Sequence, residues 1–154
     1  MILLAAGIVA ADQFSKLWIV TNVPLGAQGP AWEGIFHLTY TQNTGAAFSF
    51  LEGMTWLFIV IFVLFTAAVI WEFTKKTMGF SKFEHWCIAI IFAGGLGNII
   101  DRIRLGYVVD MIAVEFINFP VFNVADCFIT CGCIALMVSL VFFNKQFWKD
   151  DKKK

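Results

Sequence analysis

The sequence contains few charged residues and carries no net charge. Only 14% of its 154 residues are charged, and 11 basic residues balance 11 acidic ones. Nucleic-acid-binding proteins usually present a basic surface, so this composition argues against a nucleic-acid partner. Apolar residues dominate instead: 60% are hydrophobic, against roughly 45–50% in soluble proteins. So much apolar surface indicates that a lipid bilayer is the solvent.

The cysteines do not follow the pattern of a disulfide framework or of a metal site. All four lie within apolar runs, where small polarizable side chains pack well. Cys131 and Cys133 are two residues apart, so on a helix they would point to different sides and could not share a metal ion. We therefore expect packing roles for the cysteines, no metal and no cofactor.

Four apolar runs approach the roughly 20 residues that a helix needs to cross a bilayer. They cover residues 1–20, 54–73, 83–103 and 123–143. The first run resembles a secretory signal peptide, but it lacks a charged amino-terminal region and a polar stretch follows at once, so we interpret it as a retained helix. The sequence predicts an all-α integral membrane protein in which residues 1–154 form a single membrane-embedded domain.

The lysines predict how the helices are oriented. They are concentrated between the second and third runs and in the carboxy-terminal tail, whereas residues 21–53 contain no Lys or Arg. By the positive-inside rule, both termini should be cytoplasmic, and residues 21–53 and 104–122 should lie outside. Within the first outer segment, the alternating stretch IFHLTYTQ predicts a strand or hairpin at the membrane surface. We expect this small β element, which lies between the first two helices, to act as a lid.

Polar side chains gather at one depth of the predicted bundle. An ionisable group near the centre of a spanning helix costs roughly 2.5–3.5 kcal/mol on insertion scales, so each one requires a reason. In the predicted orientation, eight polar residues lie near the outer surface: Asp12, Lys16, Asn98, Asp101, Arg102, Asp110, Asn123 and Asp126. A polar cluster at this depth predicts a functional site.

Simpler interpretations exist for some of these residues. Asn123 is a good helix cap, and Asp126 would then lie in a first turn that favours an anion. Lys16 is four residues after Asp12, so the two could form a local ion pair on one helix.

Two arginines near the outer end of the third run are interpreted differently because of their spacing from Asn98. Asn98 and Arg102 share a helix face, and the small residues of AGGLGN would let a second helix approach it. We expect these two residues to support the site. The alternative for both arginines is anchoring at the membrane interface, which we accept for Arg104.

Asp110 and Asp126 at matched depth predict an aspartyl dyad. If two carboxyl groups lie close together they cannot both ionise easily, so one keeps a proton while the other acts as a base. The ionised group could deprotonate a water that attacks a peptide carbonyl, and the protonated one could hydrogen-bond the carbonyl oxygen. His37 and His85 have no nucleophile at matched depth, so no serine–histidine pair competes.

Together, the motifs resemble those of the bacterial lipoprotein signal peptidases, also called signal peptidase II. The resemblance rests on five blocks in order, which are DQFSK, NTGAAFS, GGLGNIIDR, VVDMI and FNVAD. It implies an aspartic endopeptidase that cleaves prolipoproteins just before a diacylglyceryl-modified cysteine. Asp110 and Asp126 match the catalytic pair. The supporting positions of the family correspond to Asp12, Lys16, Asn43, Gly45, Ala47, Asn98, Arg102 and Asn123.

The same resemblance implies partners and a location. They are diacylglyceryl-prolipoprotein substrates, membrane lipid and the cyclic peptide inhibitor globomycin, with no metal required. The enzyme would lie in the bacterial cytoplasmic membrane, with its active site near the extracytoplasmic face. Met111 stands where family members often have Phe. The amide of Asn43 and the flexible Gly45 are candidates for a loop that covers the site.

A small proton- or ion-coupled transporter is the leading alternative. Asp110 and Asp126 could carry protons in such a protein. Transporters tend to contain internal repeats and charges at the bilayer midplane, whereas this chain has no visible repeat and places its carboxylates near one surface. A non-catalytic scaffold would explain the helices but not the carboxylates.

Overall fold

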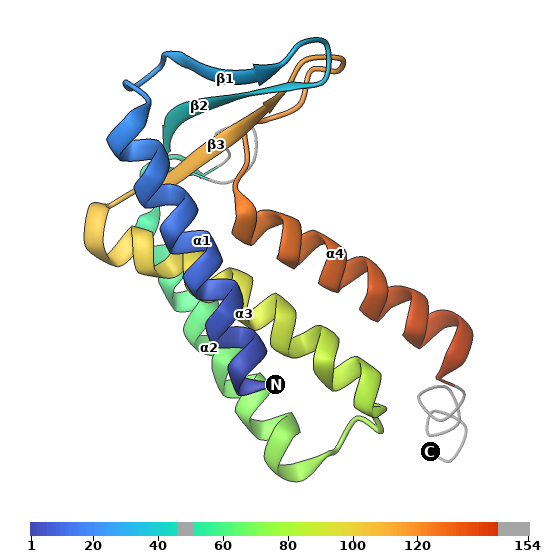
Figure 1. Cartoon of the computed structure of the whole chain (residues 1–154). Helices are drawn as coiled ribbons and strands as arrows, with labels where there is room; N and C mark the ends of the chain where they lie inside the picture. Colours follow the sequence, from blue (N-terminus) through green and yellow to red (C-terminus); the bar gives the residue numbers. More distant parts are fainter. Residues whose placement is uncertain (46–50, 145–154) are drawn as a thin grey trace.

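The computed structural model describes residues 1–45 and 51–144, in which four long helices carry a small sheet at one end (Figure 1). The predicted spans are confirmed as helices long and apolar enough to cross a membrane, and their bounds differ from the prediction by two residues at most. The last helix ends in a short π-helical segment, η2. The helical elements are α1 (Ile2–Asn22), α2 (Thr55–Lys75), α3 (Lys82–Leu105), α4 (Val124–Val138) and η2 (Ser139–Phe143).

The all-α description needs correction, because the outer segments form a three-stranded antiparallel sheet. Its strands, in the order β1–β2–β3, are β1 (Gln28–Trp32), β2 (Phe36–Asn43) and β3 (Val108–Val114). The predicted strand or hairpin at IFHLTYTQ is confirmed as β2, which forms a hairpin with β1, but the prediction missed β3. The sequence of β3 is rich in Val and Ile, which favour strands, and pairing with β2 satisfies its backbone groups. The sheet therefore joins the two outer segments.

α3 is the central helix of the bundle and packs against α1, α2 and α4. Half of its most apolar stretch is buried, against 6% for α2. Two glycines let its neighbours come close: a Cβ on Gly94 would lie 2.7 Å from the backbone oxygen of Ala125, and one on Gly97 would lie 2.5 Å from Asp12 Oδ2. The close approach that the small residues of AGGLGN predicted is thus confirmed.

The sheet is attached to the bundle at the point where α4 begins. A buried cluster joins α1 to the sheet through Ile19, Val23, Tyr40, Val109 and Met111. After β3 the chain loops out and returns, and Phe122 and Ile112 exchange backbone hydrogen bonds of 3.1 and 2.8 Å. This return brings the first turn of α4 beside the middle of β3.

Candidate active site

Asn123 hydrogen-bonds the carboxyl groups of both Asp110 and Asp126. Its side-chain amide donates to Asp110 Oδ1 at 2.7 Å, and its backbone N–H donates to Asp126 Oδ2 at 3.1 Å. Asn123 is the predicted N-cap of α4, and its side-chain oxygen accepts from the backbone N–H of Asp126 at 3.0 Å. The capping interpretation is therefore confirmed, and the same cap brings the two carboxyl groups together.

The other oxygen of each carboxyl group accepts from a second amide. Asn43, the last residue of β2, donates from Nδ2 to Asp110 Oδ2 at 2.8 Å. Asn98 of α3 donates from Nδ2 to Asp126 Oδ1 at 2.8 Å. The backbone N–H of Gly45 donates to Asn43 Oδ1 at 2.9 Å, which orients that amide. Each carboxyl group is thus held by residues from different elements of the fold.

Asp110 is buried in β3, with a relative exposure of 3%. Burial raises the pKa of the Asp110 carboxyl from its ordinary value of 3.8 to about 6, and the charge of Asp126 adds to the rise. The hydrogen bonds from Asn43 and Asn123 oppose it, because they favour the ionised form. Asp110 therefore keeps a proton at a higher pH than an exposed aspartate would.

Both carboxyl groups line a cavity of about 870 Å³ between α2, α3, α4 and the sheet. Its walls are mostly aromatic and aliphatic, and they include Phe58, Phe62 and Phe119. An apolar hollow with a few convergent polar groups is typical of a ligand site. This arrangement suits an apolar substrate whose polar reacting group lies at the two aspartates.

Arg102 contacts the cavity rather than acting as a free anchor at the interface. Its Nη2 donates to the backbone oxygen of Gly45 at 2.8 Å, and its guanidinium carbon lies 4.4 Å from the centroid of the Phe58 ring. Nη1 donates weakly to the backbone oxygen of Asn98 at 3.4 Å. Arg102 thus ties the chain at Gly45 to α3. The further predicted site residue, Ala47, lies outside the described residues.

A buried charge cluster lies behind the two carboxyl groups. Lys16 Nζ is 2.9 Å from Asp12 Oδ2 and 2.9 Å from Asp101 Oδ2, and its side chain is only 4% exposed. The local pair with Asp12 is confirmed, but the cluster also crosses to α3. Lys16 also donates to Asn98 Oδ1 at 2.9 Å, so the cluster connects directly to the amide that holds Asp126.

The sequence analysis placed Asp101 in the polar cluster without giving it a role in the site, and it did not single out Gln13. Gln13 Nε2 donates to Asp101 Oδ1 at 3.0 Å and to the backbone oxygen of Gly97 at 3.2 Å. Asp101 also accepts from the backbone N–H of Val109 at 3.1 Å, which links α3 to β3. The spacing of Asp101, three residues after Asn98, was a usable signal, because such residues neighbour each other on a helix. The available signal for Gln13 was its place in the DQFSK block, as a polar residue within an apolar run.

The described site residues form one connected set of hydrogen bonds and ion pairs. It joins all of the predicted positions except Ala47: Asp12, Lys16, Asn43, Gly45, Asn98, Arg102, Asp110, Asn123 and Asp126. The two histidines lie elsewhere, since His37 contacts Glu115 and His85 lies in the first turn of α3. The arrangement therefore offers carboxyl-based acid–base chemistry.

Known proteins resemble this chain over nearly its whole length. A family model described as signal peptidase (SPase) II matches residues 4–142. The lipoprotein signal peptidase of Streptococcus pyogenes serotype M1 is 42% identical over 144 residues, which cover 94% of this chain and 90% of the relative. The protein of the same name from serotype M5 (strain Manfredo) has the same identity and coverage.

Two solved structures share the fold. A bacterial membrane enzyme determined by the in meso method at 2.3 Å resolution has a TM-score of 0.85 and 32% identity, and the match covers 99% of this chain and 90% of that one. A second bacterial membrane enzyme, determined by the same method at 1.9 Å, has a TM-score of 0.82 and 33% identity, with 93% of each chain covered. The helices and the sheet therefore have close structural counterparts.

Proposed function

The chain belongs to the signal peptidase II family, and from this premise we propose that Asp110 and Asp126 are the catalytic pair of an aspartic peptidase. The enzyme removes the signal peptide of a prolipoprotein, cutting on the amino-terminal side of the diacylglyceryl-modified cysteine. The observation that carries the proposal is the pair of hydrogen bonds from Asn123 to both carboxyl groups at the wall of one cavity. The transporter alternative is not favoured, because the chain matches a peptidase family.

The two carboxyl groups take different roles in the proposed mechanism. We assign the shared proton to Asp110, because this carboxyl is buried in β3 and burial raises its pKa to about 6, the direction that favours the protonated form. Asp126 carries the negative charge, because it lies in the first turn of α4, where the helix dipole and the Asn123 N–H favour an anion. This division resembles that of other aspartyl pairs, in which one proton is shared between two groups.

Hydrolysis then proceeds by general acid–base catalysis. Asp126 takes a proton from water as the water oxygen bonds to the scissile carbonyl carbon, and Asp110 gives its proton to the carbonyl oxygen. When the tetrahedral intermediate collapses, the C–N bond breaks and the proton now on Asp126 passes to the leaving amine. The hydroxyl proton returns to Asp110 as the new carboxylic acid forms, so the enzyme regains its starting state.

The supporting residues hold these groups in place. Asn43, Asn98 and Asn123 donate to the carboxyl oxygens, while Lys16 with Asp12 fixes Asn98 from behind. Arg102 holds the backbone at Gly45 beside the cavity. The apolar walls would receive the signal peptide and the diacylglyceryl chains, and globomycin, a cyclic peptide, would compete for the same space.

The distribution of lysines supports a location for the site. It favours cytoplasmic termini, and hence a sheet and active site at the extracytoplasmic face of the bacterial cytoplasmic membrane. The amino terminus of α1 lies toward the end of the bundle opposite the sheet (Figure 1), as this orientation requires. A signal peptide could then reach the cavity from the bilayer while water arrives from outside.

A cleavage assay tests the catalytic pair. Purified diacylglyceryl-prolipoprotein is incubated with the detergent-solubilised wild type, with Asp110→Asn and with Asp126→Asn, each with and without a metal chelator, and the products are resolved on a gel. Glu115→Gln is the matched control, because this carboxylate lies just beyond β3 and bonds to His37 and Gly34. We expect chelator-resistant cleavage by the wild type and the control, and none by either aspartate variant. Near-normal turnover in a folded Asp110→Asn or Asp126→Asn would remove that residue from the mechanism.

A further inference from the structure

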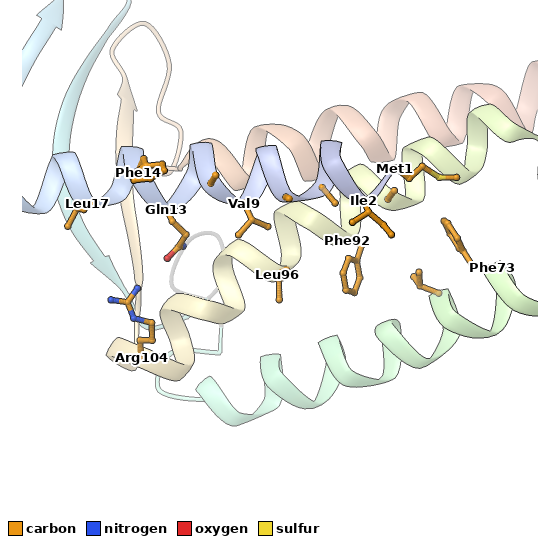
Figure 2. Close-up of a pocket in the computed structure, with 15 residues that line it drawn as sticks. Met1, Ile2, Val9, Gln13, Phe14, Leu17, Phe73, Phe92, Leu96 and Arg104 are labelled. Atoms are coloured by element: carbon orange, nitrogen blue, oxygen red, sulfur yellow. The ribbon is translucent and has the colours of Figure 1, made fainter.

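A second cavity lies on the other side of α3 from the two aspartates. It is a groove of about 810 Å³ lined mainly by α1 and α3, with α2 closing one part of it (Figure 2). It shares no lining residue with the cavity that contains Asp110 and Asp126. Whatever occupies this groove is therefore separate from the substrate in the proposed active site.

The groove is long and apolar. The groove has room because three of its lining residues are small, namely Ala6 and Ala10 of α1 and Ala89 of α3. Its larger lining side chains include Val9, Phe92 and Leu96 (Figure 2). Its lining on α1 extends from Ile2 to Leu17, which corresponds to roughly 22 Å at 1.5 Å per residue. Half of the hydrocarbon core of a bilayer is roughly 15 Å thick. A hydrocarbon chain that enters from one interface can therefore lie along the groove past the midplane.

One end of the groove is polar. Gln13 and Arg104 lie there, at the end nearest the sheet (Figure 2). Arg104 is exposed in the last turn of α3, and no described carboxylate lies within ion-pair distance of its guanidinium. Its neighbour Arg102, in contrast, is bonded to the protein backbone. An unpaired guanidinium at a membrane interface is well suited to a phosphate, which it can bind through two parallel hydrogen bonds.

We propose that this groove binds a phospholipid, with its phosphate on Arg104 and one acyl chain along α1 toward Ile2. A phospholipid places an anionic phosphate at the interface and a hydrocarbon chain below it. The groove has the matching order, with Arg104 at the interface and apolar walls below it. A transmembrane helix or a second copy of the chain would fill apolar surface, but only a phospholipid carries an anion at this depth as part of its own chemistry. Charge complementarity therefore selects the lipid.

The bound lipid would brace α1 against α3 close to the buried charge cluster. Gln13 lines the polar end of the groove and also donates to Asp101 and to the backbone of Gly97. The lipid and the Lys16 cluster would thus act on the same stretch of the two helices. Removal of the lipid should lower the melting temperature of the protein without removing any catalytic group.

Lipid retention tests the proposal. The protein is purified in a mild detergent, and bound phospholipid is identified by native mass spectrometry and by lipid extraction. We expect the wild type to retain phospholipid, Arg104→Gln to bind it about tenfold more weakly, and Arg104→Lys to fall between them. Ala10→Trp places a large side chain in the apolar part of the groove while keeping Arg104, and it should also lose the lipid. Lys75→Gln, which removes an exposed cation from α2, is the matched control and should retain it.

A photocrosslinker distinguishes the possible occupants. Placed at Ala10 in membranes that contain prolipoprotein, it should label phospholipid. Labelling of the prolipoprotein or of a second copy of the chain would overturn the proposal. Equal retention of phospholipid by the wild type, Arg104→Gln and Ala10→Trp, each shown to be folded by its cleavage activity, would also overturn it.

Discussion

Lys16 donates a hydrogen bond of 2.9 Å to the side-chain oxygen of Asn98, and this bond, together with one of 3.1 Å from Asn123 Nδ2, orients the Asn98 amide. With its oxygen held by the ammonium group, Asn98 directs its NH₂ group to Asp126 Oδ1 at 2.8 Å. A cation on α1 therefore positions a carboxyl group on α4 through a side chain of α3. The buried charges act on the proposed chemistry without touching the substrate.

Asn98→Asp should damage catalysis more than stability. The new carboxylate can still accept from Lys16, but it presents an acceptor to Asp126 where the amide presented a donor. Loss of a hydrogen bond to a charged group is worth about 1.5–3 kcal/mol, so kcat should fall by roughly 10–100-fold, with little change in KM. Steady-state cleavage kinetics and thermal unfolding measure the two effects. Wild-type kcat in this variant would show that Asn98 does not position Asp126.

Lys16→Met should destabilise the fold strongly. It leaves the carboxylates of Asp12 and Asp101 buried without their shared cation, and breaking a buried ion pair in this way costs roughly 3–5 kcal/mol. Lys75→Met is the control, because an exposed lysine should change stability by no more than about 0.5 kcal/mol. Unfolding in detergent compares the two variants. Similar stability for both would mean that the Lys16 cluster contributes little to folding.

The stability of the wild type relative to Asp110→Asn should decrease as the pH rises from about 4 to about 6. Because the pKa of Asp110 is raised from 3.8 to about 6, the folded state holds this proton more tightly than the unfolded chain. Below pH 3.8 Asp110 is protonated in both the folded and the unfolded state, so it does not change the free energy of unfolding. Above pH 6 it is ionised in both states, and burying the ionised carboxyl lowers the free energy of unfolding by about 3 kcal/mol. Unfolding of both proteins at pH 4, 5, 6 and 7 measures the difference, and a difference independent of pH would contradict the raised pKa.

Gly97→Ala should be destabilising, and Gly7→Ala should not be. A Cβ at position 97 would lie 2.5 Å from Asp12 Oδ2, which pairs with Lys16, and the other oxygen of this carboxylate, Oδ1, accepts from the Ala125 N–H. Overpacking of this kind costs typically about 1–3 kcal/mol. A Cβ on Gly7 would meet no atom within 4 Å, so alanine there should raise helix stability by roughly 0.5–1 kcal/mol. Thermal unfolding of both variants tests whether close contact between α1 and α3 is required.

The sequence alone determined the number and extent of the spanning helices. In lipid, each helix must satisfy its own backbone hydrogen bonds, so an apolar run of sufficient length is enough to predict it. The cap at Asn123 was also predictable, because its hydrogen bonds lie within four residues. The same is true of the pairing of Asp12 with Lys16, which share one helix face.

Only the tertiary structure decided how these local pieces combine. β3 forms because its backbone pairs with β2, and the contacts of Lys16 with Asn98 and of Gln13 with Asp101 join residues 82 and 88 positions apart. The separation of the groove at Arg104 from the cavity at the two aspartates likewise depends on which face of α3 each neighbour covers. Local periodicity carries no information about such long-range contacts, because they depend on how the helices pack around α3.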